Sequence, residues 1–350
     1  MVGIKDNIRK MAGYVPGEQP RGSDFIKLNT NENPYPPSPK VLEAIRSHLT
    51  SDKLRKYPEP LGEQFRQTAG KVLKIDPESI LIGNGSDDIL TILIRAFVPE
   101  MGLVASLHPS YILYRSLAEI QNAQFELIPF TPDWQIPIPC PCQNANIQFL
   151  ANPNSPTGTM VSRANLLSWL NQNSIPTVID EAYGDFADEN ALSLASDRVI
   201  ITRSFSKSYS LAGMRIGFAV ASPMLIRELI KVKDSYNCDV LSLAAAAAAI
   251  ADQDYFLECR SKIITTRKRL ELSLTHLGFQ VVPSQANFVW AKHPVIASNE
   301  IYQQLKIKNI LIRYMNYPSF GDGLRISVGT DAEIDQLLFY LDTILKGLNL

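Results

Sequence analysis

Short runs of apolar residues alternate with longer amphipathic stretches along the first two thirds of the chain. The run S-I-L-I-G (79–83) precedes the helical pattern D-D-I-L-T-I-L-I-R-A-F (87–97), and similar short runs follow at G-L-V-A-S (102–106), N-I-Q-F-L (146–150), T-V-I-D (177–180), R-V-I-I-T (198–202) and G-F-A-V-A (217–221). Runs of this length predict buried strands, and strands that alternate with helices predict a mostly parallel sheet covered by helices. We therefore expect an α/β fold.

The pattern changes in the last third of the chain. Helical periodicity runs from Pro223 to about Ala251 and resumes after about residue 255. Strand patterns follow at F-Q-V-V-P (279–283), N-F-V-W-A (287–291), N-I-L-I-R (309–313) and L-R-I-S-V-G (324–329), before a final amphipathic helix. This order predicts a smaller α+β domain. We expect an N-terminal arm at 1–45 that joins the small domain, a large domain at 46–250 and the small domain at 251–350.

Composition narrows the class of protein. The 350 residues are 45% hydrophobic and 20% charged with a formal net charge of -1, which gives no electrostatic footprint for nucleic acid or acidic membranes. The N-terminus has no apolar stretch of signal-peptide length, and no run reaches roughly 18 apolar residues. We expect a cytoplasmic protein whose partners are small molecules or another copy of the chain. The cysteines and histidines are few and lack ligand spacing, so we expect no metal site.

Polar residues follow two of the predicted strands, where ligands bind in an open parallel sheet. In G-N-G-S-D-D (83–88), Gly85 allows close backbone approach while Ser86 and Asp87 open a helix whose N-terminus suits a phosphate. The alternative is a plain turn with Asp87 as the helix cap. Asp180 ends the strand T-V-I-D and is either a structural ion-pair partner or an acid that holds a cationic ring nitrogen; Tyr183 could reach the same ligand.

The stretch R-S-F-S-K-S-Y-S-L-A-G-M-R (203–215) begins at the end of another predicted strand. Burial and a nearby Arg203 or Arg215 would lower the pKa of Lys207, and a neutral amine can attack a carbonyl to form a Schiff base. Ser204, Ser206 and Arg215 could bind a phosphate. A lone lysine is usually a surface residue, but this set meets the needs of pyridoxal phosphate: Lys207 for the aldehyde, Asp180 for the ring nitrogen and Tyr183 for the phenolate oxygen.

The sequence resembles the fold-type-I pyridoxal-phosphate-dependent aminotransferases and, within them, the histidinol-phosphate aminotransferases. The resemblance runs nearly the whole chain. Its carriers are Y-V-P-G (14–17), L-N-T-N-E-N-P (28–34), K-Y-P-E-P (56–60), G-N-G-S-D-D (83–88), P-S-Y (109–111), N-P-N-S-P-T-G (152–158), D-E-A-Y (180–183), S-F-S-K (204–207), L-A-G-M-R-I-G-F (211–218) and L-R-I-S-V-G (324–329). The first three point to the histidinol-phosphate subgroup.

The resemblance implies a mostly parallel seven-stranded sheet with a smaller α+β domain, pyridoxal phosphate as cofactor and a homodimer with shared active sites. It makes Lys207 the Schiff-base lysine and stacks Tyr111 on the ring. Around the phosphate it places Ser86, Asp87, Ser204, Ser206 and Arg215, with Tyr57 of the partner subunit. Tyr57 and Tyr111 are otherwise ordinary half-buried aromatics. The family often has N-N-P-T-G where this chain has N-S-P-T-G, so Asn154 is assigned to the ring oxygen with Ser155 as the alternative.

The resemblance also implies the reaction. Arg325 resembles the arginine that binds the substrate anion and Arg313 lies on a neighbouring predicted strand, while Tyr14 and Asn31 could close over the substrate. A guanidinium accepts either the carboxylate of glutamate or the phosphate of histidinol phosphate. We expect transamination between L-histidinol phosphate and 2-oxoglutarate, in histidine biosynthesis. The alternatives on the same fold are an aromatic-amino-acid (phenylalanine/tyrosine) aminotransferase and a threonine-phosphate decarboxylase. A cofactor-sensing regulator is disfavoured, because few residues precede these motifs.

Overall fold

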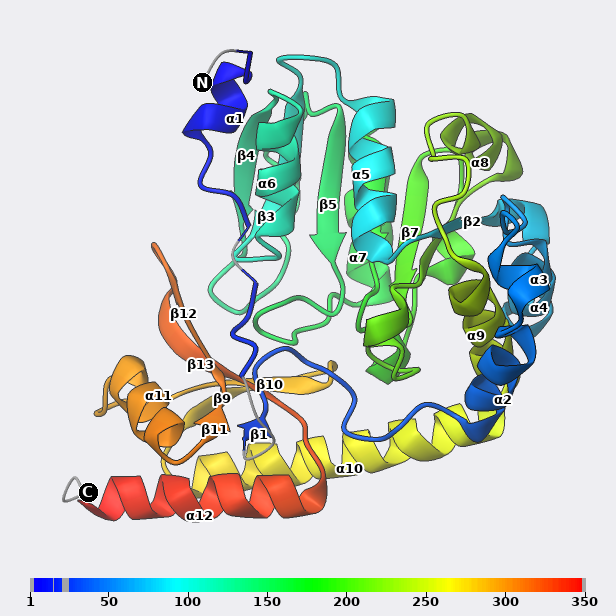
Figure 1. Cartoon of the computed structure of the whole chain (residues 1–350). Helices are drawn as coiled ribbons and strands as arrows, with labels where there is room; N and C mark the ends of the chain where they lie inside the picture. The colour runs from blue at the N-terminus through cyan, green and yellow to red at the C-terminus, as the bar shows by residue number, and fades with distance from the viewer. Residues whose placement is uncertain (1–2, 15, 21–24, 348–350) are drawn as a thin grey trace.

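Seven strands form the main sheet of the computed structural model, which describes residues 3–14, 16–20 and 25–347 (Figure 1). Val15, within the Y-V-P-G motif, lies outside the described residues. The strand order is β2-β8-β7-β6-β5-β3-β4, and only β8 runs antiparallel to its neighbours. The strands are β2 (Ile80–Gly83), β3 (Leu103–His108), β4 (Gln124–Pro129), β5 (Ile147–Ala151), β6 (Thr177–Asp180), β7 (Val199–Ser204) and β8 (Gly217–Val220). The predicted mostly parallel sheet is confirmed.

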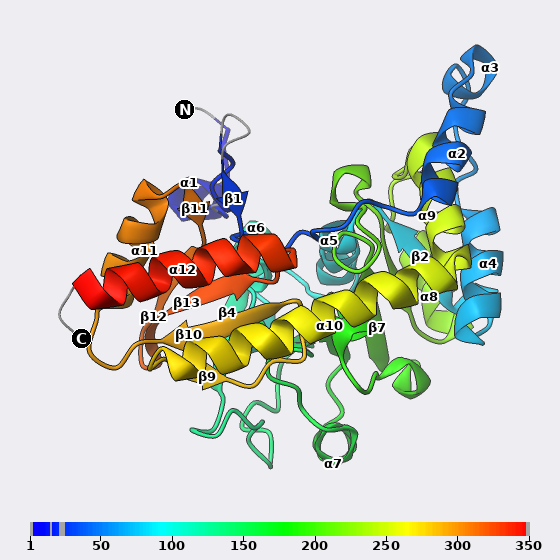
Figure 2. The same cartoon turned by 90° about the horizontal axis from the view of Figure 1, so that it is seen from below.

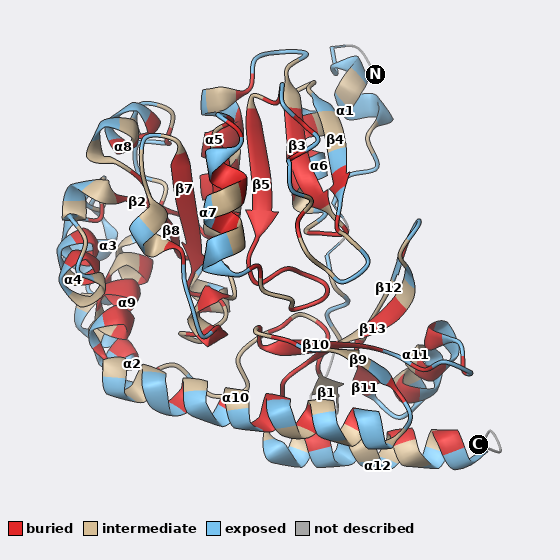
Figure 3. Ribbon diagram, turned by 180° about the vertical axis from the view of Figure 1, so that it is seen from behind, coloured by how far each residue is buried: buried red, intermediate tan, exposed pale blue. Residues whose placement is uncertain are grey.

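Helices cover both faces of this sheet and thereby bury its central strands on both sides. One face packs against α5 (Ser86–Phe97), α6 (Leu113–Ile120) and α8 (Pro223–Ile230). The other packs against α2 (Pro39–His48), α4 (Glu63–Leu73), α7 (Arg163–Asn171) and α9 (Val240–Ala251). Figure 3 shows the strands as buried and the outer sides of the helices as exposed. Shorter helices are α1 (Asp6–Lys10) and α3 (Ser51–Leu54), with 3-10 turns at Pro77–Ser79, Gly184–Phe186, Leu192–Leu194 and Ala212–Met214.

A second, antiparallel sheet is built from the last third of the chain. Its order is β12 (Arg313–Tyr317), β13 (Gly321–Ser327), β10 (Phe288–Lys292) and β9 (Gln280–Val282). It shares a core with α10 (Gln253–His276), α11 (Ser298–Ile307) and α12 (Asp331–Gly347), and Leu28 of the N-terminal arm enters the same core. Next to Leu28, β1 (Ile26–Lys27) pairs with β11 (Ile310–Leu311). Figures 1 and 2 show α10 running beneath both sheets, with α12 beside part of it. The predicted domain boundaries near residues 45 and 250 stay a prediction.

The predicted helical run from Pro223 to Ala251 is wrong in its middle. Residues 231–239 separate α8 from α9. There the Lys233 amine donates to the carbonyl oxygen of Asp234 at 2.8 Å, and the Asn237 amide donates to the Asp88 carboxylate at 2.8 Å. These side-chain hydrogen bonds hold an irregular segment against α5. The hydrophobic pattern of the sequence cannot predict them, because it contains no information on polar contacts.

Strand β4 was absent from the predicted elements. It is an edge strand with mixed exposure, so it lacks the continuous apolar run of its neighbours. Among the described residues, no single helix is long and apolar enough to cross a membrane; α9 and α10 together pass such a test, but they are bent by 78° at their break.

Candidate active site

A cavity of about 280 Å³ opens where the carboxyl ends of the main-sheet strands face the second sheet. It gathers most of the residues that the sequence singled out: Tyr14, Asn31, Ser86, Asp87, Tyr111, Asp180, Tyr183, Ser204, Ser206, Lys207, Arg215, Arg313 and Arg325. Gly85, Asn154 and Tyr57 are not among its lining residues. Segments from the arm, the main sheet and the second sheet therefore meet at one site.

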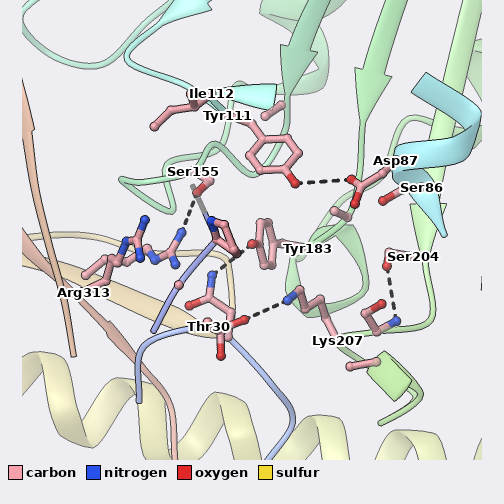
Figure 4. A pocket seen from close by; sticks show the side chains of 18 of the residues that line it. Thr30, Ser86, Asp87, Tyr111, Ile112, Ser155, Tyr183, Ser204, Lys207 and Arg313 are labelled. Atoms are coloured by element: carbon pink, nitrogen blue, oxygen red, sulfur yellow. Dashed lines mark hydrogen bonds between the residues drawn. The ribbon is translucent and has the colours of Figure 1, made fainter. Parts of the chain in front are cut away.

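Lys207 follows β7 and points into this cavity (Figure 4). Its amine donates to the carbonyl oxygen of Thr30 at 2.9 Å. Burial, and then the charges of Arg325 and Arg215, lower the pKa of Lys207 to about 8. Of the two arginines expected as alternatives, Arg215 is the one that lowers this pKa; the Arg203 guanidinium lies within 2.6 Å of the carboxylates of both Glu181 and Asp185 and is neutralised by them.

The Asp180 carboxylate lies at the end of β6 and is only 4% exposed. Its Oδ2 accepts a hydrogen bond from the Tyr114 hydroxyl at 2.7 Å. Its Oδ1 accepts from the Thr202 hydroxyl at 3.0 Å and from the amide of Ala182 at 3.1 Å. Burial raises the pKa of Asp180, and these donors oppose that rise. The result is a buried acid with a fixed orientation at the floor of the cavity.

Tyr183 is tied to the arm and to the second sheet. The Asn31 amide donates to the Tyr183 hydroxyl at 2.9 Å, and the Ser327 hydroxyl donates to the Asn31 side-chain oxygen at 2.8 Å. Burial raises the pKa of Tyr183, so the phenol holds its proton. Through these two hydrogen bonds, Asn31 links β13 to the cavity.

An anion cradle forms at the N-terminus of α5. The first helical residue is Ser86, whose backbone N-H belongs to the unpaired first turn. Arg215 approaches from the other side and donates to the Ser206 hydroxyl at 3.3 Å and to the Asp87 carboxylate at 3.3 Å. Gly85 has a φ of +85°, a backbone conformation that favours glycine, and a Cβ there would lie 2.7 Å from the Arg215 guanidinium. The cradle suits a phosphate.

The Ser204 hydroxyl completes the wall of this cradle. It accepts a hydrogen bond from the Ser206 amide at 3.2 Å, which folds the chain between β7 and Lys207 into a tight turn. Tyr111 closes the opposite side, and its hydroxyl donates to Asp87 at 3.3 Å. Burial raises the pKa of Tyr111 far above its ordinary range, so it acts as a neutral ring and donor. Its outer edge meets Tyr14 with ring centroids 6.1 Å apart.

Two arginines stand at the second-sheet side of the cavity. Arg313 and Arg325 occupy directly opposite positions on β12 and β13. Arg325 donates to the Ser155 hydroxyl and to the carbonyl oxygen of Asn29, each at 3.1 Å. Neither arginine forms an ion pair with a carboxylate within the described residues. Two cations side by side without a carboxylate partner are suited to an anionic group.

The structure separates Asn154 from Ser155. The Asn154 amide donates to the carbonyl oxygen of Pro109 at 3.1 Å and to the Thr157 hydroxyl at 3.0 Å. Its side-chain oxygen is buried without a hydrogen-bond partner in the described structure. Ser155 lines the cavity instead, so the geometry keeps both residues as candidates for the ring oxygen.

Tyr57 lies apart from the cavity. Its side chain is 81% exposed and stacks on Tyr236 with ring centroids 4.4 Å apart. A large aromatic that is stacked in this way, yet exposed, is suited to contact another molecule.

Sequence reasoning missed several residues that support the site. They are Thr30, which accepts from Lys207; Tyr114 and Thr202, which donate to Asp180; and Ser327, which donates to Asn31. Tyr114 follows Tyr111 by three residues, one helical turn, and that spacing was the available signal. Thr202 is the polar last residue of an apolar run, two positions before Ser204.

Comparison with known proteins gives one consistent family. The sequence profile of aminotransferase class I and II matches residues 23–341. The chain is 49% identical to a histidinol-phosphate aminotransferase of Rhodopirellula baltica, over 98% of this chain and 96% of the relative. It is 47% identical to one of Synechocystis, over 99% of both chains. In structure it resembles the histidinol-phosphate aminotransferase of Sinorhizobium meliloti solved with pyridoxal-5'-phosphate, with a TM-score of 0.88, 25% identity and 99% coverage of both chains.

Proposed function

Because the chain belongs to the class I and II aminotransferases, we propose that it interconverts L-histidinol phosphate and 2-oxoglutarate with 3-(imidazol-4-yl)-2-oxopropyl phosphate and L-glutamate, in histidine biosynthesis. The observation that carries this proposal is one cavity that holds an amine of lowered pKa, a buried carboxylate and two unpaired arginines. The first two serve the chemistry, and the arginines select anionic substrates.

The residues of the cavity fit pyridoxal phosphate. Lys207 would hold its aldehyde, and Asp180 would hold a proton on its ring nitrogen. The cradle of Ser86, Ser204, Ser206 and Arg215 would take the phosphate, with Gly85 leaving room for the guanidinium. Tyr183 and either Asn154 or Ser155 would reach the ring oxygen, and Tyr111 would cover one ring face. When bound, the cofactor supplies an aldehyde that captures the substrate amine and a ring that withdraws electrons from the substrate carbon.

Lys207 would transfer the proton of the substrate carbon. With its pKa at about 8, the free amine accepts a proton from the substrate carbon near neutral pH and can return it to another atom of the same site. Burial raises the pKa of Asp180, and the hydroxyls of Tyr114 and Thr202 oppose that rise by donating to the carboxylate. The hydroxyl of Tyr183 stays protonated and donates.

Arg313 and Arg325 would bind the far end of each substrate in turn. A carboxylate of glutamate and the phosphate of histidinol phosphate are both anions that guanidinium groups bind in a bidentate manner. Tyr14, which reaches the cavity from the arm, and Asn31 would close over the bound substrate.

We propose a cytoplasmic homodimer with shared active sites. Tyr57 is held on Tyr236 away from its own cavity, and the tyrosine pair is exposed, so its hydroxyl is free to reach the phosphate cradle of a second copy. The four-residue helix α3 and the start of α4 flank this projecting tyrosine.

The test is a substrate panel on purified protein loaded with pyridoxal phosphate. Histidinol phosphate, phenylalanine and threonine phosphate are each supplied with 2-oxoglutarate, and both glutamate and carbon dioxide are measured. We expect glutamate from histidinol phosphate without release of carbon dioxide, and no turnover by Lys207→Ala. Faster turnover of phenylalanine than of histidinol phosphate would indicate an aromatic aminotransferase, and carbon dioxide from threonine phosphate would indicate a decarboxylase.

A further inference from the structure

Tyr114 is a wholly buried tyrosine whose hydroxyl lies directly beside Asp180. It is the second residue of α6, one turn after Tyr111, so the same helix end supplies both a wall of the cavity and a donor beneath it. The Tyr114 ring stacks on Phe149 of β5, with centroids 4.8 Å apart and an angle of 14° between the rings. This stack fixes the hydroxyl 2.7 Å from Oδ2 of Asp180.

Asp180 receives its other hydrogen bonds on the opposite oxygen. Thr202 from β7 and the amide of Ala182 both donate to Oδ1, so the Tyr114 hydroxyl is the protein donor to Oδ2 within the described structure. A carboxylate held at both oxygens cannot rotate, and a hydrogen bond from a neutral hydroxyl stabilises its charged form more than its protonated form.

We propose that Tyr114 is a positioning residue, whose hydroxyl holds the Asp180 carboxylate in the orientation and charge state that a protonated ring nitrogen requires. This inference rests on the proposed function, in which Asp180 meets the ring of pyridoxal phosphate. Tyr114 itself lines no part of the cavity and acts only through Asp180.

The surroundings of Asp180 leave few other groups to set its charge. The groups that act on it or feel it electrostatically are Asp87 from α5, Tyr111 before α6 and Tyr183 after β6. Asp87 opposes the charged form, and burial keeps the two tyrosines protonated, so neither tyrosine carries a charge. The hydrogen bonds from Tyr114, Thr202 and the amide of Ala182 are therefore what lowers the pKa of Asp180 against the effect of burial.

The variant Tyr114→Phe tests this inference because it keeps the ring and its stack on Phe149. The matched control is Tyr209→Phe, which removes the hydroxyl of another stacked, partly buried tyrosine that lies away from Asp180. A second variant, Thr202→Val, removes one of the two donors to Oδ1 with little change of shape, and it tests the same dependence of Asp180 on hydroxyl donors if Tyr114→Phe does not fold.

The first readout is thermal unfolding of the cofactor-free proteins between about pH 4 and about pH 8. Burial raises the pKa of Asp180 in the folded protein above its unfolded value near 3.8, so folding favours the protonated carboxyl. The stability that this carboxyl contributes is present below the unfolded pKa and is lost as the pH rises through the folded pKa. Loss of the Tyr114 donor raises that folded pKa further. The melting temperature of Tyr114→Phe should therefore fall further below wild type as the pH rises, whereas the deficit of Tyr209→Phe should stay constant.

The second readout is the loaded enzyme. We expect Tyr114→Phe to lower kcat about 10- to 100-fold, the range of one hydrogen bond to a charged group, and to bind pyridoxal phosphate about tenfold more weakly, with KM for histidinol phosphate nearly unchanged. A pH-independent stability deficit together with wild-type cofactor affinity and kcat would overturn the inference. If wild type fails to turn over histidinol phosphate while the stability and affinity changes appear as expected, the proposed substrate is wrong and the role of Tyr114 stands.

Discussion

The lowered pKa of Lys207 predicts how fast the cofactor-free protein captures an aldehyde. Burial, Arg325 and Arg215 bring this pKa from the ordinary 10.5 to about 8. At pH 7 a pKa of about 8 leaves about one amine in ten neutral, whereas 10.5 would leave about one in three thousand. Only the neutral amine attacks a carbonyl. Lys207 should therefore capture pyridoxal phosphate about 300-fold faster than an ordinary lysine of equal access.

The assay mixes cofactor-free protein with pyridoxal phosphate from about pH 6 to about pH 11, follows the visible absorbance and traps the product on Lys207 with borohydride. The rate should rise with pH and level off above about pH 8, where the amine is already neutral. The variant Arg325→Gln removes a cation that disfavours the ammonium form, so its profile should shift to higher pH. Arg313→Gln, a neutralisation on the facing strand, is the matched control and should shift it less.

Two results would refute this reasoning. The first is a wild-type rate that keeps rising to about pH 10.5, which would give Lys207 an ordinary pKa. The second is a profile of Arg325→Gln that coincides with wild type, because the neighbouring cation would then have no influence on the amine.

Three further changes test the site, the assembly and the fold. Lys207→Ala should still bind pyridoxal phosphate weakly but produce no glutamate from histidinol phosphate and 2-oxoglutarate; full activity in a coupled glutamate assay would contradict its role. Tyr57→Ala and Lys207→Ala subunits, each nearly inactive alone, should regain part of the wild-type activity when they are refolded together, and absence of recovery would argue against shared sites. Arg203→Leu leaves Glu181 buried without its partner and should lower the free energy of unfolding by about 3–5 kcal/mol in a urea titration, while a loss under about 1 kcal/mol would show that the pair contributes little.

The ends of the main-sheet strands were the most predictable part of the site. Asp180 and Lys207 stand at or just after continuous apolar runs, and a parallel sheet brings the carboxyl ends of such runs to one edge. The order of the strands within the sheet does not follow from the pattern, since β2 pairs with β8 and not with a strand near it in sequence. The seven-stranded arrangement came from the family resemblance.

Side-chain partners could not be predicted from spacing. Arg203 was one of two arginines that could act on Lys207, four residues away, yet its partners Glu181 and Asp185 lie 22 and 18 residues earlier. Arg325 donates to the carbonyl of Asn29, which is 296 residues distant. Such contacts depend on how the arm and the second sheet dock on the main sheet, and hydrophobic periodicity carries no information about that docking.

The type of partner nevertheless distinguishes a structural cation, Arg203, from the cations proposed to act in the site, Lys207 and Arg325. Arg203, deep beside β6, is paired with two carboxylates, and a buried pair of this kind is costly to break. Lys207 and Arg325 instead donate to neutral oxygens, the carbonyls of Thr30 and Asn29 and the hydroxyl of Ser155.

A neutral acceptor satisfies a cation without cancelling its charge, so an incoming anion or aldehyde displaces it at small cost. Arg215 in the cradle differs, because it pairs with the Asp87 carboxylate, but this ion pair is half exposed and such pairs are worth about 0–1 kcal/mol. The carbonyl oxygens of Asn29 and Thr30 in the arm thus hold Arg325 and Lys207 without neutralising them, which leaves both cations able to meet a ligand.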